Sequence, residues 1–286
     1  MELHMHGTRG SIAVPSDKTI TTTEFGGNTT CAELVASDGT RHIIDAGTGI
    51  RQLGLKMMKS GFGVGSQGAL YFTHTHGDHI EGLRFFKPAY VNGAHINVYG
   101  PLRLVKGDTL TIRRDLESMA ATHPEPGTRV LVQGDKIKQT LGKQMDKELF
   151  PAQLEWMKAL KYIDFFPEKK AIYDTQTLRI DTKNLNHPGG CVSYKFTEPK
   201  TGNVLVFNTD YEPTSNDDAL IGWWKDAHTV YADSQYEHWD EKNTPNPFIK
   251  TFGHSNWRTN VDYAARAGLK RILLGHHEPT MGDDYH

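Results

Sequence analysis

The 286-residue sequence contains few cysteines, no long apolar run and almost no excess of charge. Its two cysteines, Cys31 and Cys191, exclude a disulfide framework and suit a reducing compartment. No run of about 18 apolar residues occurs, and the N-terminal segment lacks the charged and apolar regions of a secretory signal. We therefore expect a cytoplasmic protein without a membrane span.

The charge balance disfavours one large class of partners. The chain has 32 Lys and Arg against 34 Asp and Glu, a net charge of -2. A protein that binds long nucleic acid has to neutralise many phosphates and needs a positive field. We therefore expect a small-molecule partner and no long nucleic acid. A composition of 37% hydrophobic residues indicates a globular chain that buries its own core.

Short apolar runs between Gly, Asn and Asp predict strands, and longer stripes with helical spacing predict helices. The expected strands cover residues 3–6, 32–36, 42–45, 69–73, 178–184, 192–196, 204–208, 229–232 and 271–274. Helical spacing covers residues 50–58, 80–90, 217–224 and 256–267. This order of elements indicates an α/β protein with two sheets and helices outside them.

No long polar linker divides the chain, so we expect a single domain over residues 1–286. Residues 101–170 are expected to form a mostly helical insertion, with an amphipathic stripe at Trp156, Leu160, Ile163 and Phe166. Residues 102–170 include 13 basic and 10 acidic side chains, so the insertion is only mildly basic.

Fifteen histidines are the unusual feature of the composition, and four metal-competent side chains gather in His74-x-His76-x-Asp78-His79. In an extended backbone residues two apart point the same way, so His74 and His76 can bind one cation. A tighter turn around Gly77 redirects Asp78 and His79, which can hold a second cation nearby. We therefore predict a site for two divalent metal ions.

Two cations need more ligands than one short loop provides. His187, Asp210 and His276 each follow a predicted strand, and the Asp210 carboxylate could bridge both ions. His277 is the immediate competitor of His276. Taken singly, His187 and Asp210 could instead cap turns, and His276 could be a structural histidine at a strand edge. Their shared position at strand ends favours the metal site.

These motifs, in this order along nearly the whole chain, resemble the metallo-β-lactamase superfamily. The resemblance implies an αββα sandwich of two mixed β-sheets with outer helices, holding one or two metals between the sheets. It places His74, His76 and His187 on one metal, Asp78, His79 and His276 on the other, and Asp210 between them. Zinc suits these ligands, with manganese or iron as alternatives. Relatives often pair, so the resemblance also implies a homodimer.

Three further segments resemble the phosphodiesterase branch of that superfamily: Gly7-Thr-Arg-Gly-Ser11, Gly26-Gly-Asn-Thr29 and Asp45-Ala-Gly-Thr-Gly49. That branch includes ribonuclease Z, which processes transfer-RNA 3′ ends, and cyclic-nucleotide phosphodiesterases such as the anti-Pycsar type. Gly253-His254-Ser255 is similar to the histidine motif with which the branch helps the leaving group depart, and Asp233 stands where a carboxylate orients that histidine. Alternatively, His254 merely neighbours the cap of the helix at 256–267.

The sequence therefore predicts a dinuclear-metal hydrolase that cleaves phosphodiester bonds, most readily those of small cyclic nucleotides. A hydroxide shared by the metals is the expected nucleophile, Asp78 orients it, and His254 held by Asp233 protonates the departing oxygen. One alternative is transfer-RNA 3′ processing, although ribonuclease Z carries a Gly-rich basic arm that the mildly basic insertion does not resemble. Others are hydrolysis of a lactone or thioester and, least favoured, a non-catalytic nucleotide sensor.

Two roles stay open at this point. Arg9, Asn28 and Arg258 could contact phosphate or do nothing specific. Asp45, beside the expected site, could orient a metal-ligating histidine or merely cap the loop that ends at Gly49.

Overall fold

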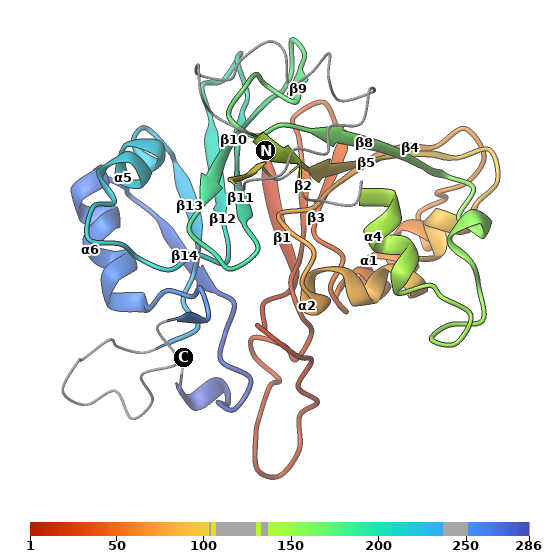
Figure 1. The fold of residues 1–286 in the computed structure, drawn as a ribbon, viewed down its shortest axis with the longest axis horizontal. Coiled ribbons are helices and arrows are strands. Elements are labelled where there is room, and N and C mark those ends of the chain that lie inside the picture. Colours follow the sequence, from red (N-terminus) through yellow and green to blue (C-terminus); the bar gives the residue numbers. More distant parts are fainter. Residues whose placement is uncertain (103, 107–129, 133–136, 237–250, 286) are drawn as a thin grey trace.

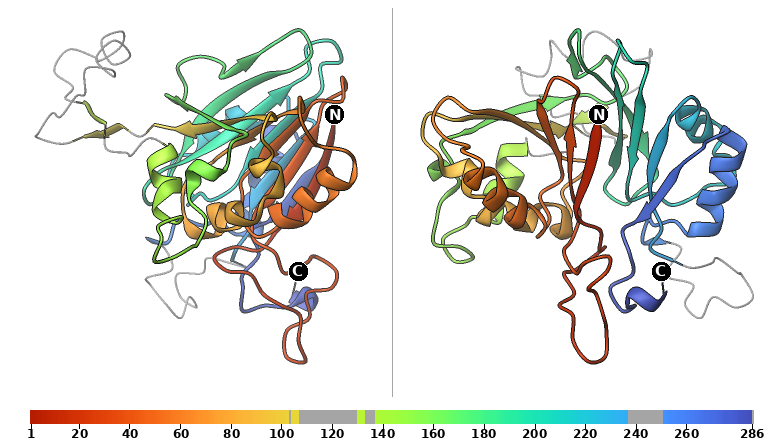
Figure 2. Two further views of the ribbon diagram at one scale, coloured as in Figure 1. Left: turned by 90° about the vertical axis from the view of Figure 1, so that its right-hand side faces the viewer. Right: turned by 180° about the vertical axis from the view of Figure 1, so that it is seen from behind.

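The computed structural model describes residues 1–102, 104–106, 130–132, 137–236 and 251–285. Two six-stranded sheets pack face to face and carry helices on their outer faces (Figure 1; Figure 2). This arrangement confirms the predicted αββα sandwich. Within the described part of the chain, no helix is long and apolar enough to cross a membrane.

The first sheet is built by the N-terminal half of the chain in the order β1-β2-β3-β4-β5-β8. Its strands are β1 (Glu2–Gly7), β2 (Cys31–Val35), β3 (Arg41–Ile44), β4 (Gln67–Tyr71), β5 (His95–Pro101) and β8 (Leu160–Phe165). The first three strands form the antiparallel meander that the sequence predicts, and β3, β4, β5 and β8 are parallel.

The second sheet is built by the C-terminal half in the order β14-β13-β12-β11-β10-β9. Its strands are β9 (Tyr173–Asp174), β10 (Arg179–Leu185), β11 (Cys191–Thr197), β12 (Val204–Asn208), β13 (Thr229–Asp233) and β14 (Ile272–Gly275). Because β12, β13 and β14 are parallel neighbours, their carboxyl ends meet at one edge of the sheet. That edge is where functional side chains gather in open α/β sheets.

Helices cover both outer faces. They are α1 (Ile50–Lys59), α2 (Gly77–Ile80), α4 (Ile137–Lys143), α5 (Asp218–Trp224) and α6 (Trp257–Ala267), with 3₁₀ turns at Glu81–Phe85, Lys87–Tyr90, Leu154–Trp156 and Asp283–Tyr285. A separate two-stranded ribbon pairs β6 (Leu104–Lys106) with β7 (Val130–Val132). Figure 2 shows α1 and α4 on the side of the first sheet and α5 and α6 on the side of the second.

Three apolar layers hold this sandwich together. One lies between the first sheet and its helices, one between the second sheet and its helices, and the third between the two sheets. The central layer is rich in aromatic rings, including the stacked pairs Tyr71 with Tyr99 and Phe207 with Tyr231, whose centroids lie 4.7 and 4.4 Å apart. Offset ring pairs of this kind add to the free energy gained by burial.

Local apolar spacing misled the sequence analysis in two places. In place of one helix over residues 80–90, Ile80 ends α2 and two short 3₁₀ turns follow at Glu81–Phe85 and Lys87–Tyr90, with a proline in the first turn of the second. The amphipathic stripe expected to be helical ends in the strand β8, because the edge of β5 offers hydrogen-bond partners that no local pattern shows. Part of the expected insertion, at 103, 107–129 and 133–136, lies outside the described residues.

Buried His42 makes the stability of the sandwich sensitive to acid. Its side chain is 2% exposed, and its ring nitrogens lie 3.0 Å from the Tyr71 hydroxyl and 3.2 Å from the Thr40 hydroxyl. Burial lowers the pKa of His42 to about 4. In the unfolded chain the pKa is about 6.5, so the unfolded state binds more protons between these values.

We therefore expect His42 to lower the free energy of unfolding by up to about 3 kcal/mol as the pH falls from about 6.5 to about 4. Urea denaturation of the wild type and of His42→Gln across this range measures the effect. As the pH falls, the free energy of unfolding of the wild type should decrease more than that of His42→Gln. A constant difference would show that His42 does not titrate with folding.

Candidate metal centre

Apart from His254, which precedes α6 (Trp257–Ala267), the residues of the candidate site lie at or after the end of a strand. His74, His76, Asp78 and His79 follow β4, His187 follows β10, Asp210 follows β12, Asp233 ends β13, and His276 follows β14. Asp45, Asp210 and His276 adopt φ values of 59°, 46° and 59°. This left-handed conformation turns the chain sharply, so each side chain leaves the strand and points into the space between the sheets.

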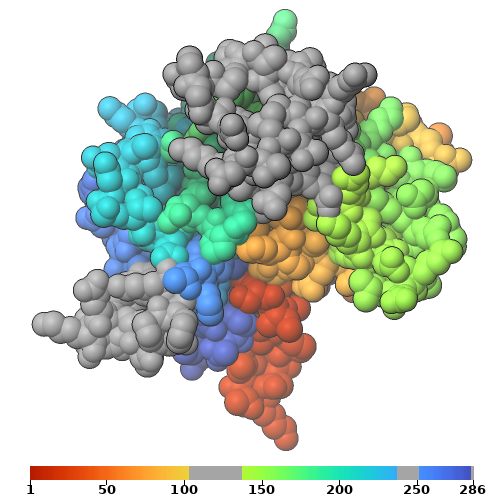
Figure 3. Space-filling view, viewed as in Figure 1, coloured from red at the N-terminus to blue at the C-terminus, as the bar shows by residue number. Residues whose placement is uncertain are grey.

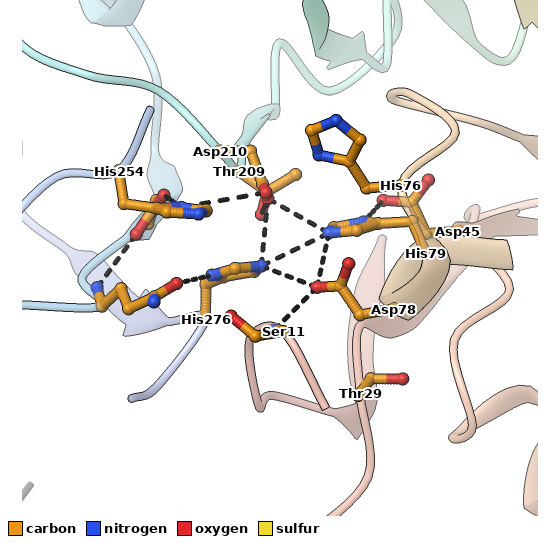
Figure 4. Close-up of polar contacts among 12 residues, drawn as sticks. Ser11, Thr29, Asp45, His76, Asp78, His79, Thr209, Asp210, His254 and His276 are labelled. Carbon is orange, nitrogen blue, oxygen red and sulfur yellow. Dashed lines mark hydrogen bonds and ion pairs between the residues drawn. The ribbon is translucent and has the colours of Figure 1, made fainter. Parts of the chain in front are cut away.

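The metal-competent side chains of the described residues form five overlapping groups, two of which include His254. Two adjoining groups contain the six residues predicted to bind the metals separately. Figure 4 draws His76 from one of them and Asp78, His79 and His276 from the other. In one group, His74, His76 and His187 place their ligand atoms within 4.8 Å of one another. In the other, the Asp78 Oδ2 atom lies 3.2 Å from Nε2 of His79 and 3.2 Å from Nε2 of His276. The structure therefore brings together all six of these residues predicted from the sequence.

Asp210 lies between the two groups. Its Oδ1 atom is 3.3 Å from Nε2 of His79 and 3.3 Å from Nε2 of His276. Its Oδ2 atom is 3.5 Å from Nε2 of His74 and 3.9 Å from Nε2 of His187. The two oxygens of one carboxylate thus face different groups, as the bridging role requires.

Hydrogen bonds at the Nδ1 atoms of the histidine rings determine the state of the Nε2 atoms, which face one another. Nδ1 of His79 donates to Asp45 at 2.8 Å, and Nδ1 of His276 donates to the Gln235 side-chain oxygen at 3.0 Å. Nδ1 of His187 donates to the Gly253 carbonyl at 2.7 Å. These acceptors carry no hydrogen, so they assign the tautomers. In its neutral form, each of the three rings therefore presents an Nε2 lone pair inward.

His74 follows the same rule through Thr73. The Thr73 hydroxyl donates to Asp45 at 2.7 Å, so it accepts from Nδ1 of His74 at 3.1 Å. Nε2 of His74 is buried and has no hydrogen-bond partner in the described residues. A buried orphan acceptor that faces other acceptors is unfavourable unless a cation binds there. Imidazole nitrogens and carboxylates are ligands that divalent metals prefer, so these residues fit a metal centre.

The electrostatics of the two groups differ. Burial lowers the pKa of His187 to about 4, although Asp210 opposes it. Burial also lowers the pKa of His276, but Asp210 and Asp78 outweigh it and raise that pKa to about 9. For Asp210, burial raises the pKa, and the surrounding imidazoles, His276 above all, bring it well below its usual range. Asp210 therefore stays ionised at neutral pH.

His254 stands next to this cluster and is held by a carboxylate. Its Nδ1 atom lies 2.8 Å from Oδ2 of Asp233, and its ring stacks on the His276 ring with centroids 4.8 Å apart. Figure 4 shows the His254 ring beside His276 and Asp210. Because Asp233 occupies Nδ1, the Nε2 atom remains for another partner.

Close backbone contacts surround the candidate ligands His276 and His187. A Cβ atom at Gly10 would lie 2.4 Å from Nδ1 of His276, and one at Gly253 would lie 2.3 Å from Nδ1 of His187. The Ser11 amide donates to Asp78 at 2.9 Å. The roles of Gln235 and Thr73 were not predicted from the sequence, because a polar residue near a strand end carries no signal until its neighbours are known. Ser11 was noted only as the end of a motif, and its contact to Asp78 was not predicted.

Arg9 has a structural place. Its side chain is fully buried, and it donates to the backbone carbonyls of Gly26 at 3.1 Å and Met281 at 2.8 Å. It also lies 3.3 Å from Asp283. These contacts join the N-terminal loop to the C-terminal segment, which adjoin in the space-filling view (Figure 3). The guanidinium therefore binds its own chain, whereas Asp45 takes the orienting role considered for it.

Comparison with known proteins identifies the fold. No protein-family model matches the chain. Ribonuclease Z of Streptococcus pyogenes serotype M3 is 26% identical over 239 residues, which cover 72% of this chain and 70% of the relative. A diphosphatase of the PhnP family superposes with a TM-score of 0.60 and 16% identity, covering 99% of this chain and 89% of the other. The metallo-β-lactamase fold protein YhfI of Bacillus subtilis gives 0.58 and 14%, covering 96% and 86%.

The chain has the metallo-β-lactamase fold. The resemblance to this superfamily and to its phosphodiesterase branch, predicted from the motifs, is confirmed together with the ribonuclease Z relative. Of the two adjacent histidines, His276 belongs to the metal-competent groups found among the described residues. His277 instead packs beside Phe25, with ring centroids 5.5 Å apart.

The pair His276 and His277 allows a matched test of the metal centre. We expect His276→Ala to lower the metal content of the purified protein, because it removes a ligand atom shared with Asp78 and His79. His277→Ala, an equal truncation of the adjacent buried residue, should retain the wild-type metal content. Elemental analysis after dialysis measures both. Equal metal loss in the two variants would contradict the geometry.

Proposed function

We propose that this protein is a metal-dependent phosphodiesterase that acts on small cyclic nucleotides. The observation that carries the proposal is the His254–Asp233 pair, 2.8 Å apart, beside a cluster of inward-facing metal-competent atoms. A metal centre alone serves many hydrolytic reactions. A carboxylate-held histidine next to it supplies the proton that an alkoxide leaving group needs.

In this proposal two divalent cations, zinc in the first place and manganese or iron as alternatives, occupy the two groups. His74, His76 and His187 would hold one cation, Asp78, His79 and His276 would hold the other, and Asp210 would serve both. When bound, such cations stabilise negative charge on a phosphoryl oxygen and lower the pKa of water. The inward lone pairs and the unpartnered Nε2 atom of His74 support this assignment.

The chain's own residues then divide the proton transfers. The Ser11 amide donates to Oδ2 of Asp78, which leaves Oδ1 to accept a hydrogen bond from the attacking water. On the other side of the cluster, Asp233 keeps the His254 ring oriented through the contact between its Oδ2 atom and Nδ1. His254 gives the proton on Nε2 to the departing ribose oxygen.

The net charge of the chain and the activity named for one protein of similar fold both favour a small substrate over a polymer. The net charge of -2 provides few cations for a long phosphate backbone. The PhnP-family protein with a similar fold is a diphosphatase. The ribonuclease Z relative favours the second candidate, processing of transfer-RNA precursors.

Two accompanying proposals concern the state of the protein. We propose a cytoplasmic location, supported by Cys31 and Cys191, which are both buried and free. We also propose a homodimer, which the resemblance implies. The molecular mass of the protein in solution tests whether it is a homodimer.

A substrate panel tests the reaction class. Wild-type protein with its metal content measured should hydrolyse bis(p-nitrophenyl) phosphate and at least one cyclic mononucleotide. Asp78→Ala should lower kcat by about 10³-fold, because it removes both a metal ligand and the contact to water. The panel also includes cyclic dinucleotides, a transfer-RNA precursor and a lactone. A fully metallated protein that turns over only the lactone would refute the proposal.

A second test isolates the proton donor. In His254→Ala, kcat for the cyclic mononucleotide should fall by about 10²-fold or more, the usual contribution of a positioned acid. The metal content should stay at the wild-type level, because this variant keeps all seven proposed metal ligands: the three residues for each cation and Asp210. Stopped assays and elemental analysis of the same preparation measure the two quantities. Loss of metal in step with activity would make His254 a ligand instead.

A further inference from the structure

Asn260 is a fully buried polar side chain that touches three segments of the candidate site. It projects from α6, and its side-chain oxygen accepts hydrogen bonds from the Tyr211 hydroxyl and, at 3.4 Å, from the Ser255 hydroxyl. Its amide nitrogen donates to the backbone carbonyl of Asp233. Since that carbonyl is only an acceptor and the hydroxyls can donate, this orientation satisfies every partner.

Each of the three partners is a residue of the candidate site or directly follows one in the sequence. Tyr211 directly follows Asp210, and Ser255 directly follows His254. The third contact is to the backbone of Asp233 itself. The Asn260 amide group thus connects the segments that carry Asp210, His254 and Asp233. None of these three segments is next to another in the sequence.

The helix that carries Asn260 is itself firmly held. The Asn256 side chain caps its first turn by accepting from the Thr259 amide at 3.0 Å, and Gly268 ends it in a left-handed conformation with φ of 72°. Tyr263 and Ala264 are buried on the same helix. A fixed helix makes Asn260 a rigid reference point for three loops, because a buried amide with satisfied hydrogen bonds has no competing orientation.

We propose that Asn260 is a positioning residue that holds the His254–Asp233 pair in register with Asp210, so that the proton reaches the leaving oxygen. This inference rests on the proposed function. Its consequence depends on the leaving group. A ribose oxygen departs as a strongly basic alkoxide and needs the proton, whereas p-nitrophenolate is a stable anion and departs without it. A displaced proton donor therefore slows the first substrate more than the second.

The test compares two substrates in one variant. Asn260→Leu keeps the branched shape of the side chain, although leucine is larger, and removes all three hydrogen bonds. For the 3′,5′-cyclic mononucleotide that the wild type hydrolyses fastest, we expect kcat to fall by about 10- to 100-fold, as for a misplaced catalytic group. For bis(p-nitrophenyl) phosphate the fall should be at least about tenfold smaller. Metal content and KM for both substrates should stay within about threefold of the wild type.

Asn256→Ala is the matched control. It removes a buried asparagine from the same helix and costs the helix its cap, about 1 kcal/mol of stability, but leaves the three loops connected. The ratio of the two kcat values should then match the wild type. An equal change of ratio in this control would assign the effect to general loosening and overturn the proposal. So would a parallel loss on both substrates in Asn260→Leu.

Tyr211→Phe provides a second route to the same answer. It removes only the hydroxyl that donates to Asn260, and we expect a smaller change of the ratio in the same direction. If Asn260→Leu does not fold, an unchanged ratio in a folded Tyr211→Phe protein overturns the proposal. A wild type that cleaves no phosphodiester refutes the proposed function itself. A wild type that cleaves both substrates, with an unchanged ratio in the variants, refutes only the role of Asn260.

Discussion

The candidate site depends on one electrostatic constraint: imidazole nitrogens and carboxylate oxygens, all electron-pair donors, face one another at short distances. Nε2 atoms of His79 and His276 lie 3.3 Å apart, and a carboxylate oxygen of Asp210 lies 3.3 Å from each. If the rings are neutral, lone pairs repel at these distances. Protonation or a cation relieves the repulsion, and only a cation also serves the buried His74 nitrogen. The rest of the fold must therefore hold the donors in place.

The groups behind the histidines do this with different chemistry. Asp45, a carboxylate, accepts from His79, whereas the neutral Gln235 amide accepts from His276. A carboxylate partner makes an imidazole a stronger electron donor than an amide does. Two histidines proposed for the same cation are thus unequal ligands. Asp45 also accepts from the Thr73 hydroxyl, so one buried carboxylate orients His79 directly and His74 through Thr73.

The sequence predicted those parts of the molecule whose signal is local. Strand runs, the motif from His74 to His79 and isolated ligands at strand ends are all visible without knowing which strands are neighbours. Gln235 and Asn260 were not predictable, because their roles exist only once β13 lies between β12 and β14 and α6 packs beside them. The strand β8 was missed for the same reason, since its partner β5 supplies the hydrogen bonds that decide its conformation.

The sandwich and the site are also coupled through the backbone. Asp45, Asp210 and His276 are held at positive φ, which costs a side-chain-bearing residue about 1 kcal/mol or more. Such conformations persist only where the surroundings overdetermine them. Asp45 and Asp210 follow strands packed between two apolar layers, whereas His276 follows the edge strand β14. Hydrogen bonds or carboxylate contacts fix all three side chains. A substitution that loosens the aromatic layer between the sheets therefore weakens the support of the strained backbone at Asp45 and Asp210.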